Sequence, residues 1–136
     1  MRFVKISAEE MREIKSLYEG VMSYASHGLF FREGCVLGES IGKMAKKGEA
    51  DFFKTAKAML VGRGWAEDVE FHFRTVVIHG SIEASFESDA PACHRIRGIV
   101  KRLYEINNDR LFECKEVECA ATGADQCTFV LEESSF

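Results

Sequence analysis

Residues 116–127 read EVECAATGADQC and place one carboxylate and two thiols around a glycine. Thiolates and carboxylates are zinc ligands, and zinc takes four such groups in a tetrahedron. Cys119 and Cys127 would lie at the two ends of a glycine-containing hairpin, so pairing of its strands would bring their sulfurs together. Glu116 precedes Cys119 by three residues, an odd spacing that puts the two side chains on opposite faces of a regular strand. A metal site here therefore predicts a bulge or a strand end near Val117 and Glu118.

The fourth ligand must come from another part of the chain. Cys93 lies at the start of a predicted helix, where the helix dipole favours a thiolate. His94 is its neighbour, and Cys114 has the strand parity of Glu116 and could replace it. The spacing alone leaves three interpretations open: a zinc site, buried thiols without a ligand, and redox or catalytic thiols.

The composition limits the class of protein. With 46% apolar and 29% charged residues, the 136-residue chain is an ordinary globular protein that can bury one core. Eleven phenylalanines indicate a well-filled core or a pocket lined by rings. The net charge of −4, with lysine and arginine scattered among acids, argues against nucleic acid and against a cationic membrane-binding face.

The chain shows no targeting or membrane signal. Its first residues, MRFVKISAEEMREI, do not form a secretory leader, and no apolar run approaches the ~18 residues of a membrane span. We therefore expect a cytoplasmic protein. In that reducing compartment an odd number of cysteines, five, argues against a disulfide framework.

Two helices are predicted in the first third of the chain. Ser7 and Glu10 form a capping-box pattern that opens a helix with one apolar stripe, and His27–Gly28 ends it. A second helix covers residues 32–48, with Cys35 as a small core residue. Its predicted inward residues are Val36, Leu37, Ile41, Met44 and Ala45.

Three glycines of the second helix, Gly34, Gly38 and Gly42, fall four residues apart on one face. Each costs about 1 kcal/mol relative to alanine in a helix interior, so a packing or pocket reason should offset them. The glycines leave either room for the close approach of another helix or space for a ligand. We favour close packing, because glycine removes bulk without adding chemistry.

The rest of the chain predicts one more helix, two strands, a fourth helix and two further strands. Asp51 caps a helix that runs through Leu60 and ends at Gly62. A period of two follows from residue 69 to 86, with a bend at Gly80, and Pro91 opens the fourth helix. The last hairpin covers about 111–119 and 126–132. The fold class is therefore α+β in a single domain of residues 1–136, with helices packed on one face of an antiparallel sheet.

Four segments of the sequence resemble the 4-vinyl-reductase domain family. They are GLFFREGCVLGESIGK, GRGW, ACHRIRGIVKRLYE and EVECAATGADQCTF, and they appear in order over about residues 15–132. The last two are the most specific: a cysteine at the head of a helix, and Glu-x2-Cys-x7-Cys-x-Phe in the final hairpin. The resemblance implies the fold of the sensor domains of phenol- and toluene-responsive transcription activators, which small subunits of vesicle-tethering complexes share.

The resemblance also implies a ligand set for the metal. Carried over residue by residue, the structural zinc of the sensors falls on Cys93, Glu116, Cys119 and Cys127. Four protein ligands leave no open position, so the zinc is expected to be structural and no catalytic residue is expected.

Family sensors hold small aromatic molecules in an apolar cavity beneath the helices. We expect six residues near such a cavity here: Met44, Phe52, Trp65, Phe71, His72 and Tyr104. The same residues could simply fill the core, as aromatic stripes usually do. The His and Trp that hold the ligand hydroxyl in the phenol sensors do not map with certainty onto His72 and Trp65.

Three functions follow from these observations. The leading one is a zinc-stapled, homodimeric sensor domain that binds a small hydrophobic or aromatic ligand and acts through a partner protein. Its first helix and its glycine-bearing helix are the expected dimer surface. The second is an interaction module without a ligand, and the third is a reductase or its accessory. The third ranks last, because the sequence has no dinucleotide fingerprint and no flavin motif.

Overall fold

The structure is a computed structural model that describes residues 1–135. Over this range the chain forms four α-helices, two short 3₁₀ helices and one four-stranded sheet, in the predicted order of helices and strands. The elements are α1 (Ala8–Met22), α2 (Ala25–Lys47), α3 (Phe52–Gly62), β1 (Asp68–Phe71), β2 (Thr75–His79), η1 (Ile82–Ala84), α4 (His94–Asn108), β3 (Phe112–Glu118), η2 (Ala120–Thr122) and β4 (Cys127–Glu133).

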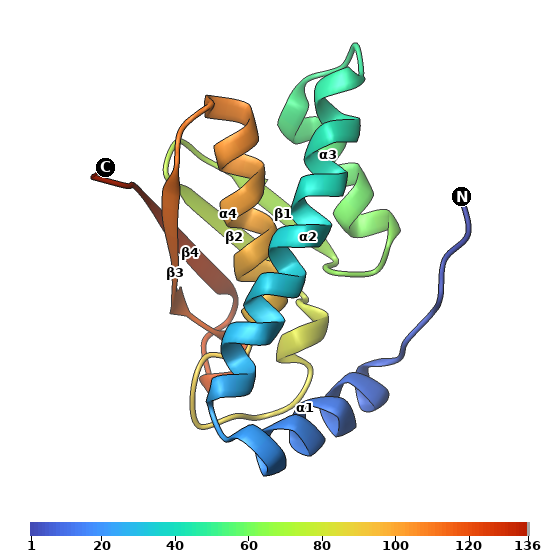
Figure 1. Cartoon of the computed structure of the whole chain (residues 1–136), viewed down its shortest axis with the longest axis vertical. Helices are drawn as coiled ribbons and strands as arrows, with labels where there is room; N and C mark the ends of the chain where they lie inside the picture. The colour runs from blue at the N-terminus through green and yellow to red at the C-terminus, as the bar shows by residue number, and fades with distance from the viewer. Residues whose placement is uncertain (136) are drawn as a thin grey trace.

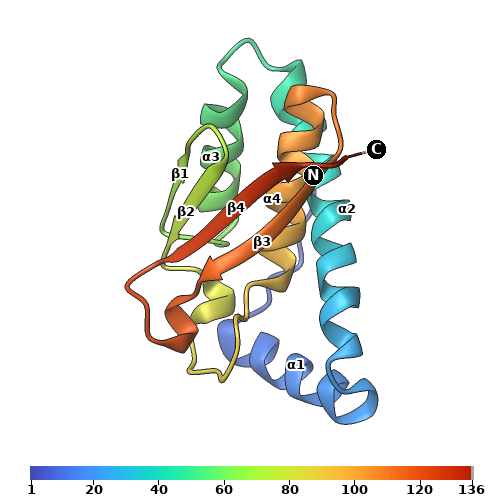
Figure 2. The same cartoon turned by 90° about the vertical axis from the view of Figure 1, so that its left-hand side faces the viewer.

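All strand pairs of the sheet are antiparallel, in the order β1-β2-β4-β3. Figure 1 and Figure 2 show α2, α3 and α4 stacked behind one face of the sheet, with α1 lying across one end of the molecule. The fold is therefore the predicted α+β arrangement with its helices on one side of the sheet.

The first helix begins as predicted but ends earlier. Ser7 and Glu10 form the capping box, with both side chain–backbone hydrogen bonds present. The helix stops at Met22, because Ser23 has a φ of 52° and turns the chain. The predicted end at His27–Gly28 is wrong, since α2 already begins at Ala25 and carries both residues.

Helices α2 and α4 pack backbone to backbone. A Cβ added at Gly34 would overlap the carbonyl oxygen of Arg95, and one at Gly98 would overlap the carbonyl of Phe31. At Gly38 it would lie 2.8 Å from the Ile99 carbonyl oxygen. The glycines therefore allow close helix packing, as predicted.

This packing corrects two expectations. The glycine face of α2 is covered by α4 of the same chain, so it cannot also form a dimer surface. Val36 was expected to point inward but its side chain is 70% exposed, because it lies on the side of α2 away from α4.

The middle of the chain departs from the prediction in two places. Asp51 caps α3 through its side chain, as expected, and Gly80 adopts a φ of 63° at the predicted bend. The expected strand up to Phe86 is wrong, because Ile82–Ala84 form the 3₁₀ helix η1. Pro91 does not open α4, whose N-cap is Cys93.

The core lies between the sheet and the helices. Its largest fully buried side chains include Tyr104, Phe112 and Phe129, and the half-buried rings of Phe53 and Phe71 stack beside Tyr104. No helix among residues 1–135 is long and apolar enough to cross a membrane.

Candidate metal centre and neighbouring cavities

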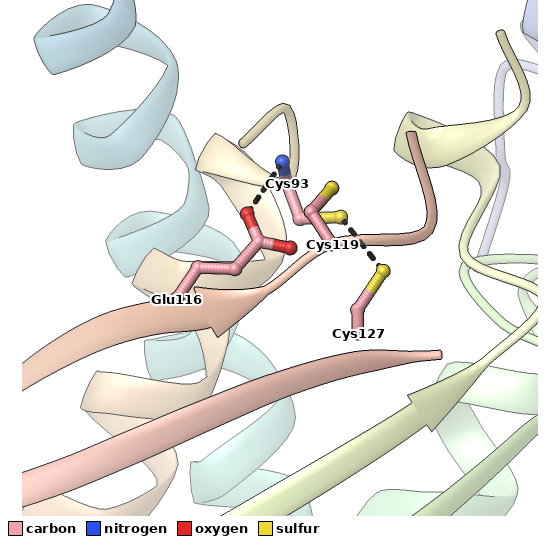
Figure 3. Close-up of side chains that lie close together, drawn as sticks. All are labelled: Cys93, Glu116, Cys119 and Cys127. Atoms are coloured by element: carbon pink, nitrogen blue, oxygen red, sulfur yellow. Dashed lines mark hydrogen bonds between the residues drawn. The ribbon is translucent and has the colours of Figure 1, made fainter. Parts of the chain in front are cut away.

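Four chain segments bring one buried ligand group each to a single point. Cys93 is the N-cap of α4, Glu116 lies near the end of β3, Cys119 precedes η2 and Cys127 opens β4. Their ligand atoms all lie within 4.8 Å of one another, and all four residues are buried. Figure 3 shows the three sulfurs and the carboxylate converging between α4 and the last hairpin.

The expected bulge is present in β3. Glu116 pairs with Phe129 and Glu118 pairs with Thr128, so one residue of β3, Val117, has no partner across the ladder. The extra residue turns Glu116 and Cys119 to the same side, which a regular strand would not do. The half-exposed side chain of Val117 points away from the cluster's buried interior.

Hydrogen bonds hold the ligand groups in place. The backbone N–H of Cys93 donates to Glu116 Oε1 at 3.1 Å, and that of Ala120 donates to Cys127 Sγ at 3.3 Å. Ser81 Oγ lies 3.1 Å from Cys93 Sγ, and the sulfurs of Cys93 and Cys127 are 3.6 Å apart. Backbone and hydroxyl donors around sulfur are the contacts that orient thiolate ligands of a metal.

The charge state of the cluster favours a bound cation. Burial raises the pKa of Glu116 to about 8, and hydrogen bonding to Cys119 raises the pKa of Cys127 to about 12. Contacts with Cys119 and Cys127 also raise the pKa of Cys93. Within the described chain, Glu116 Oε2 is buried and has no hydrogen-bond partner. A metal ion would satisfy this oxygen and allow the acidic groups to ionise together, so the residues fit a metal.

The rejected ligand candidates lie outside this cluster. Cys114 and Cys35 are half-buried, and neither belongs to the group of converging ligand atoms. His94 follows Cys93, but its ring stacks on His27 at 4.0 Å between centroids. The structure thus brings together the four residues that the resemblance implied.

The six residues expected near a ligand do not belong to this cluster. Tyr104 is buried, and its hydroxyl donates to the carbonyl of His72 at 2.6 Å. The His72 side chain itself is 57% exposed. Phe52, Trp65 and Phe71 are half-buried against the core, and Met44 is half-buried on α2.

Two adjoining cavities lie instead at the end of the molecule covered by α1. One has a volume of about 200 Å³ and is bounded by α1, η1 and the start of α4. The second, about 640 Å³, is more open and lies between α1, residues 87–91 and η2. None of the six expected ligand residues lines either cavity, so their role stays a prediction. The first cavity was not predicted from the sequence, because its wall η1 carries the alternating pattern of a strand.

The fold and the buried cluster define a small α+β domain with a candidate metal centre built into its last hairpin. Residues 75–133 match the V4R domain family model. The matched segment contains all four converging residues.

Two solved structures share the fold. One is the phenol-responsive sensory domain of the transcription activator PoxR with phenol, with a TM-score of 0.83 and 15% identity over 98% of this chain and 77% of that chain. The other is a vinyl-4-reductase family protein from Methanocaldococcus jannaschii, with a TM-score of 0.61 and 18% identity over 99% of both chains. No curated protein sequence matches this chain. At these identities the structures establish the fold alone.

Proposed function

We propose that this chain is a zinc-stapled domain of the sensor type, which binds a small aromatic or hydrophobic molecule and passes the signal to a partner protein. The observation that carries the proposal is the buried cluster of Cys93, Glu116, Cys119 and Cys127, in a fold similar to a sensory domain solved with phenol. The cluster supports a structural metal and the fold supports a ligand-binding role.

Zinc is the metal that this donor set suits best. Three sulfurs select soft or borderline ions, and four protein ligands complete the tetrahedron that zinc prefers. With no position left for water or substrate, the ion would hold the last hairpin against the start of α4. Its contribution is therefore stability and shape.

An apolar ring is the ligand class that the size of the smaller cavity favours. A cavity of about 150 Å³ lined by apolar side chains is enough to bind benzene. The cavity beside η1 has about 200 Å³, which suits a single ring with one substituent. Because no ligand-binding cavity by itself produces a response, the domain would act through another chain.

Native mass spectrometry tests both parts of the proposal. We expect one zinc per chain in the purified protein, and an added mass after incubation with a panel of single-ring aromatic compounds. A chain that folds with no metal would contradict the zinc centre. The ligand-binding role would be contradicted if the zinc-loaded chain bound none of the aromatic compounds, with neither an added mass nor a shift in melting temperature.

An interaction module without a ligand is the second candidate, and the exposed apolar side chains of the first two helices favour it. Leu17 and Val21 on α1 and Val36 on α2 are 62%, 76% and 70% exposed. Side chains of this kind are often covered by a partner chain. If the chain is such a module, the purified protein should contain zinc, and none of the aromatic compounds should bind to it.

A further inference from the structure

The helix that carries Cys93 begins without a cap of its own. Cys93 is the N-cap of α4, but its side chain accepts no hydrogen bond from the helix. An N-cap side chain normally accepts the backbone N–H of the second or third helical residue, which here are Arg95 and Ile96. Cysteine is not a preferred residue at this position, and the sulfur of Cys93 is turned toward that of Cys127, 3.6 Å away. The first turn of α4 therefore needs an acceptor from elsewhere.

Glu83 supplies this acceptor from η1. Its Oε2 accepts the N–H of Arg95 at 3.2 Å, and its Oε1 accepts the N–H of Ile96 at 2.8 Å, so each oxygen takes one of the two groups. The Glu83 side chain is 5% exposed, and Arg95 Nη1 lies 3.6 Å from Oε2. Arg95 also bonds Glu33 of α2 at 3.0 Å. Charge-assisted bonds of this kind fix the place where α4 begins.

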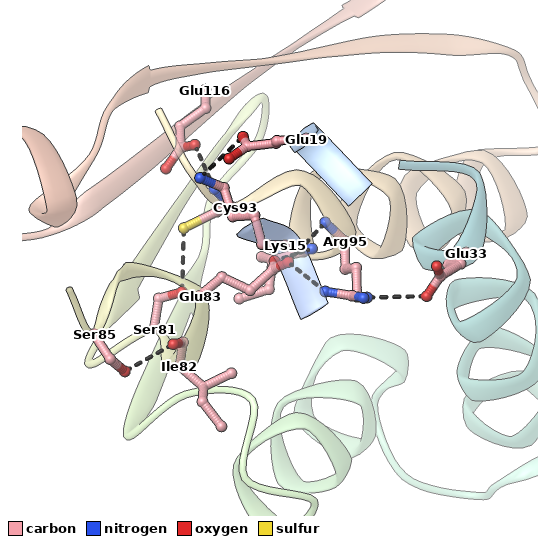
Figure 4. A network of polar contacts seen from close by, with 11 residues as sticks. Lys15, Glu19, Glu33, Ser81, Ile82, Glu83, Ser85, Cys93, Arg95 and Glu116 are labelled. Atoms are coloured by element: carbon pink, nitrogen blue, oxygen red, sulfur yellow. Dashed lines mark hydrogen bonds and ion pairs between the residues drawn. The ribbon is translucent and has the colours of Figure 1, made fainter. Parts of the chain in front are cut away.

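Ser81, two residues before Glu83, contacts the sulfur of Cys93 directly. Ser81 Oγ and Cys93 Sγ are buried and lie 3.1 Å apart. A thiolate has no proton to donate, so the hydroxyl would donate to the sulfur of a metal-bound Cys93. Figure 4 shows both contacts leaving one short segment, from Ser81 to Cys93 and from Glu83 to Arg95. The segment thus holds Cys93 at its sulfur and through the helix that carries it.

The remaining groups of this turn are satisfied in other ways or not at all. The N–H of Cys93 donates to Glu116 of the cluster, and the N–H of His94 donates to the Ala92 carbonyl at 3.0 Å. His94 Nε2 is buried and has no hydrogen-bond partner among the described residues, so this ring gives Cys93 no support.

We propose that Ser81 and Glu83 are positioning residues of the metal centre, which offer the ion no ligand atom but hold Cys93 where it can bind. Cys93 is the member of the cluster that needs such support, because the other three share the last hairpin and Cys93 joins them from the start of α4. Removing the partner of a metal ligand typically weakens metal binding by about 10–100-fold. The inference rests on the metal centre proposed above and extends it to residues outside the ligand set.

Ser81→Ala and Ser85→Ala form a matched pair that tests the contact with the sulfur. Both variants remove one hydroxyl from the same part of the chain, but Ser85 Oγ is exposed and donates to the Ile82 carbonyl at 2.7 Å. Competition with a chromogenic chelator measures the zinc dissociation constant of each purified protein. We expect Ser81→Ala to raise this constant by about tenfold or more. Ser85→Ala should leave it within about twofold of wild type.

Glu83→Gln and Asp51→Ala form a second pair, which separates positioning from stability. Glutamine keeps the size of Glu83 but has only one acceptor oxygen, so one N–H of α4 would face an amide NH₂ group. Asp51 caps α3 by accepting the N–H groups of Phe53 and Lys54, and it does not belong to the cluster. Both variants should lower the melting temperature. Only Glu83→Gln should raise the zinc dissociation constant, by about tenfold.

Cobalt provides a readout that a loss of stability alone would not change. Tetrahedral Co²⁺ bound by thiolates absorbs visible light, and the absorption depends on the number and the distance of the sulfurs. We expect a weaker and shifted sulfur-to-cobalt band in both test variants, Ser81→Ala and Glu83→Gln. Both control variants should keep the wild-type spectrum.

The outcomes separate this inference from the metal centre itself. A wild-type protein that binds neither zinc nor cobalt would overturn the metal centre, and the inference with it. A wild type that binds zinc, with test variants that match their controls in affinity and spectrum, would overturn the inference alone. An effect confined to one test variant would keep that residue's role and overturn the other's. If Glu83→Gln does not fold, Ser81→Ala decides, because it removes a single hydroxyl.

Discussion

Cys127 is the member of the proposed metal centre whose loss should affect the protein most. It is fully buried as the first residue of β4, and its sulfur contacts both Cys93 and the N–H of Ala120. We expect Cys127→Ser to lose zinc, and with it on the order of 3–5 kcal/mol of unfolding free energy, because the ion cross-links two distant segments. For a domain of this size the melting temperature should fall by roughly 10–20 °C. Zinc analysis and thermal unfolding measure the two effects.

Cys35→Ala provides the matched control for that variant. Cys35 is half-buried on α2 and does not belong to the converging cluster. The variant should keep one zinc per chain and lose little stability. Loss of zinc from Cys35→Ala would show that the ligand set is wrong.

The pH dependence of stability should differ between the zinc-loaded and metal-free proteins. Burial raises the pKa of the Glu116 carboxyl from 4.5 to about 8 in the metal-free fold. The folded state then binds this proton more tightly than the unfolded state, so the contribution of this carboxyl to stability is full below about pH 4.5 and is lost as pH rises through about 8. Zinc stabilises the ionised form, so the gap in melting temperature between the two proteins should widen from pH 6 to pH 8. A gap that stays constant or narrows would contradict a Glu116-bound metal.

Most of the candidate metal centre could be predicted from residue types and spacing. Glu116, Cys119 and Cys127 share one hairpin, and the odd spacing of the first two required the bulge that the structure has at Val117. Spacing alone could not choose Cys93 over His94 or Cys114 as a ligand. The choice depends on how α4 packs against the hairpin, and that contact joins residues far apart in the chain. The unpartnered nitrogen of His94 was not foreseeable, because only the packing of α1 and α2 shows what its ring faces.

At the scale of elements, the contact between α2 and α4 depends on residues without side chains. We expect Gly34→Ala to destabilise the domain by about 3 kcal/mol, because its Cβ would overlap the Arg95 carbonyl and force the two helices apart. Gly28→Ala is the matched control on the same helix, where an added Cβ meets nothing within 4 Å. It should be neutral or stabilise by up to about 1 kcal/mol. Chemical denaturation measures both, and equal effects would mean that the close packing is not needed.

The elements that sequence analysis misplaced have no local sequence pattern that marks their true type or their true ends. Ser23 ends α1 with an unusual φ although serine seldom breaks a helix, and the early start of α2 allows Phe30 to be buried. Ile82 and Ala84 alternate with polar residues as in a strand, yet they form η1 because Glu83 must reach the N-terminus of α4. By contrast, Ser7 and Asp51 cap their helices through side-chain hydrogen bonds to the backbone, and both residue types are typical N-caps that can be identified from the sequence alone.

At the scale of the whole molecule, α1 should lie in a dimer interface. Its Leu17 and Val21 stay largely exposed to solvent among residues 1–135, and the glycine face of α2 already packs on α4. We expect Leu17→Glu with Val21→Glu to turn a homodimer into a monomer, because two carboxylates would have to lose water on association. Leu111→Glu, exposed by 58% between α4 and β3, is the control and should remain dimeric. Light scattering at working concentration measures the mass, and a monomeric wild type would contradict the expectation.

The position of Cys93 and Cys127 in the chain has a consequence for its topology. Their sulfurs belong to residues 34 positions apart, so a metal held by both closes a ring of polypeptide that contains all of α4 and β3. In polymer terms such a ring removes roughly 3–4 kcal/mol of conformational entropy from the unfolded chain. A protease that cut the turn after Asp109 would therefore leave two fragments tied together through the metal. Unlike a disulfide, such a metal-closed ring would not be opened by reduction, and a chelator would open it.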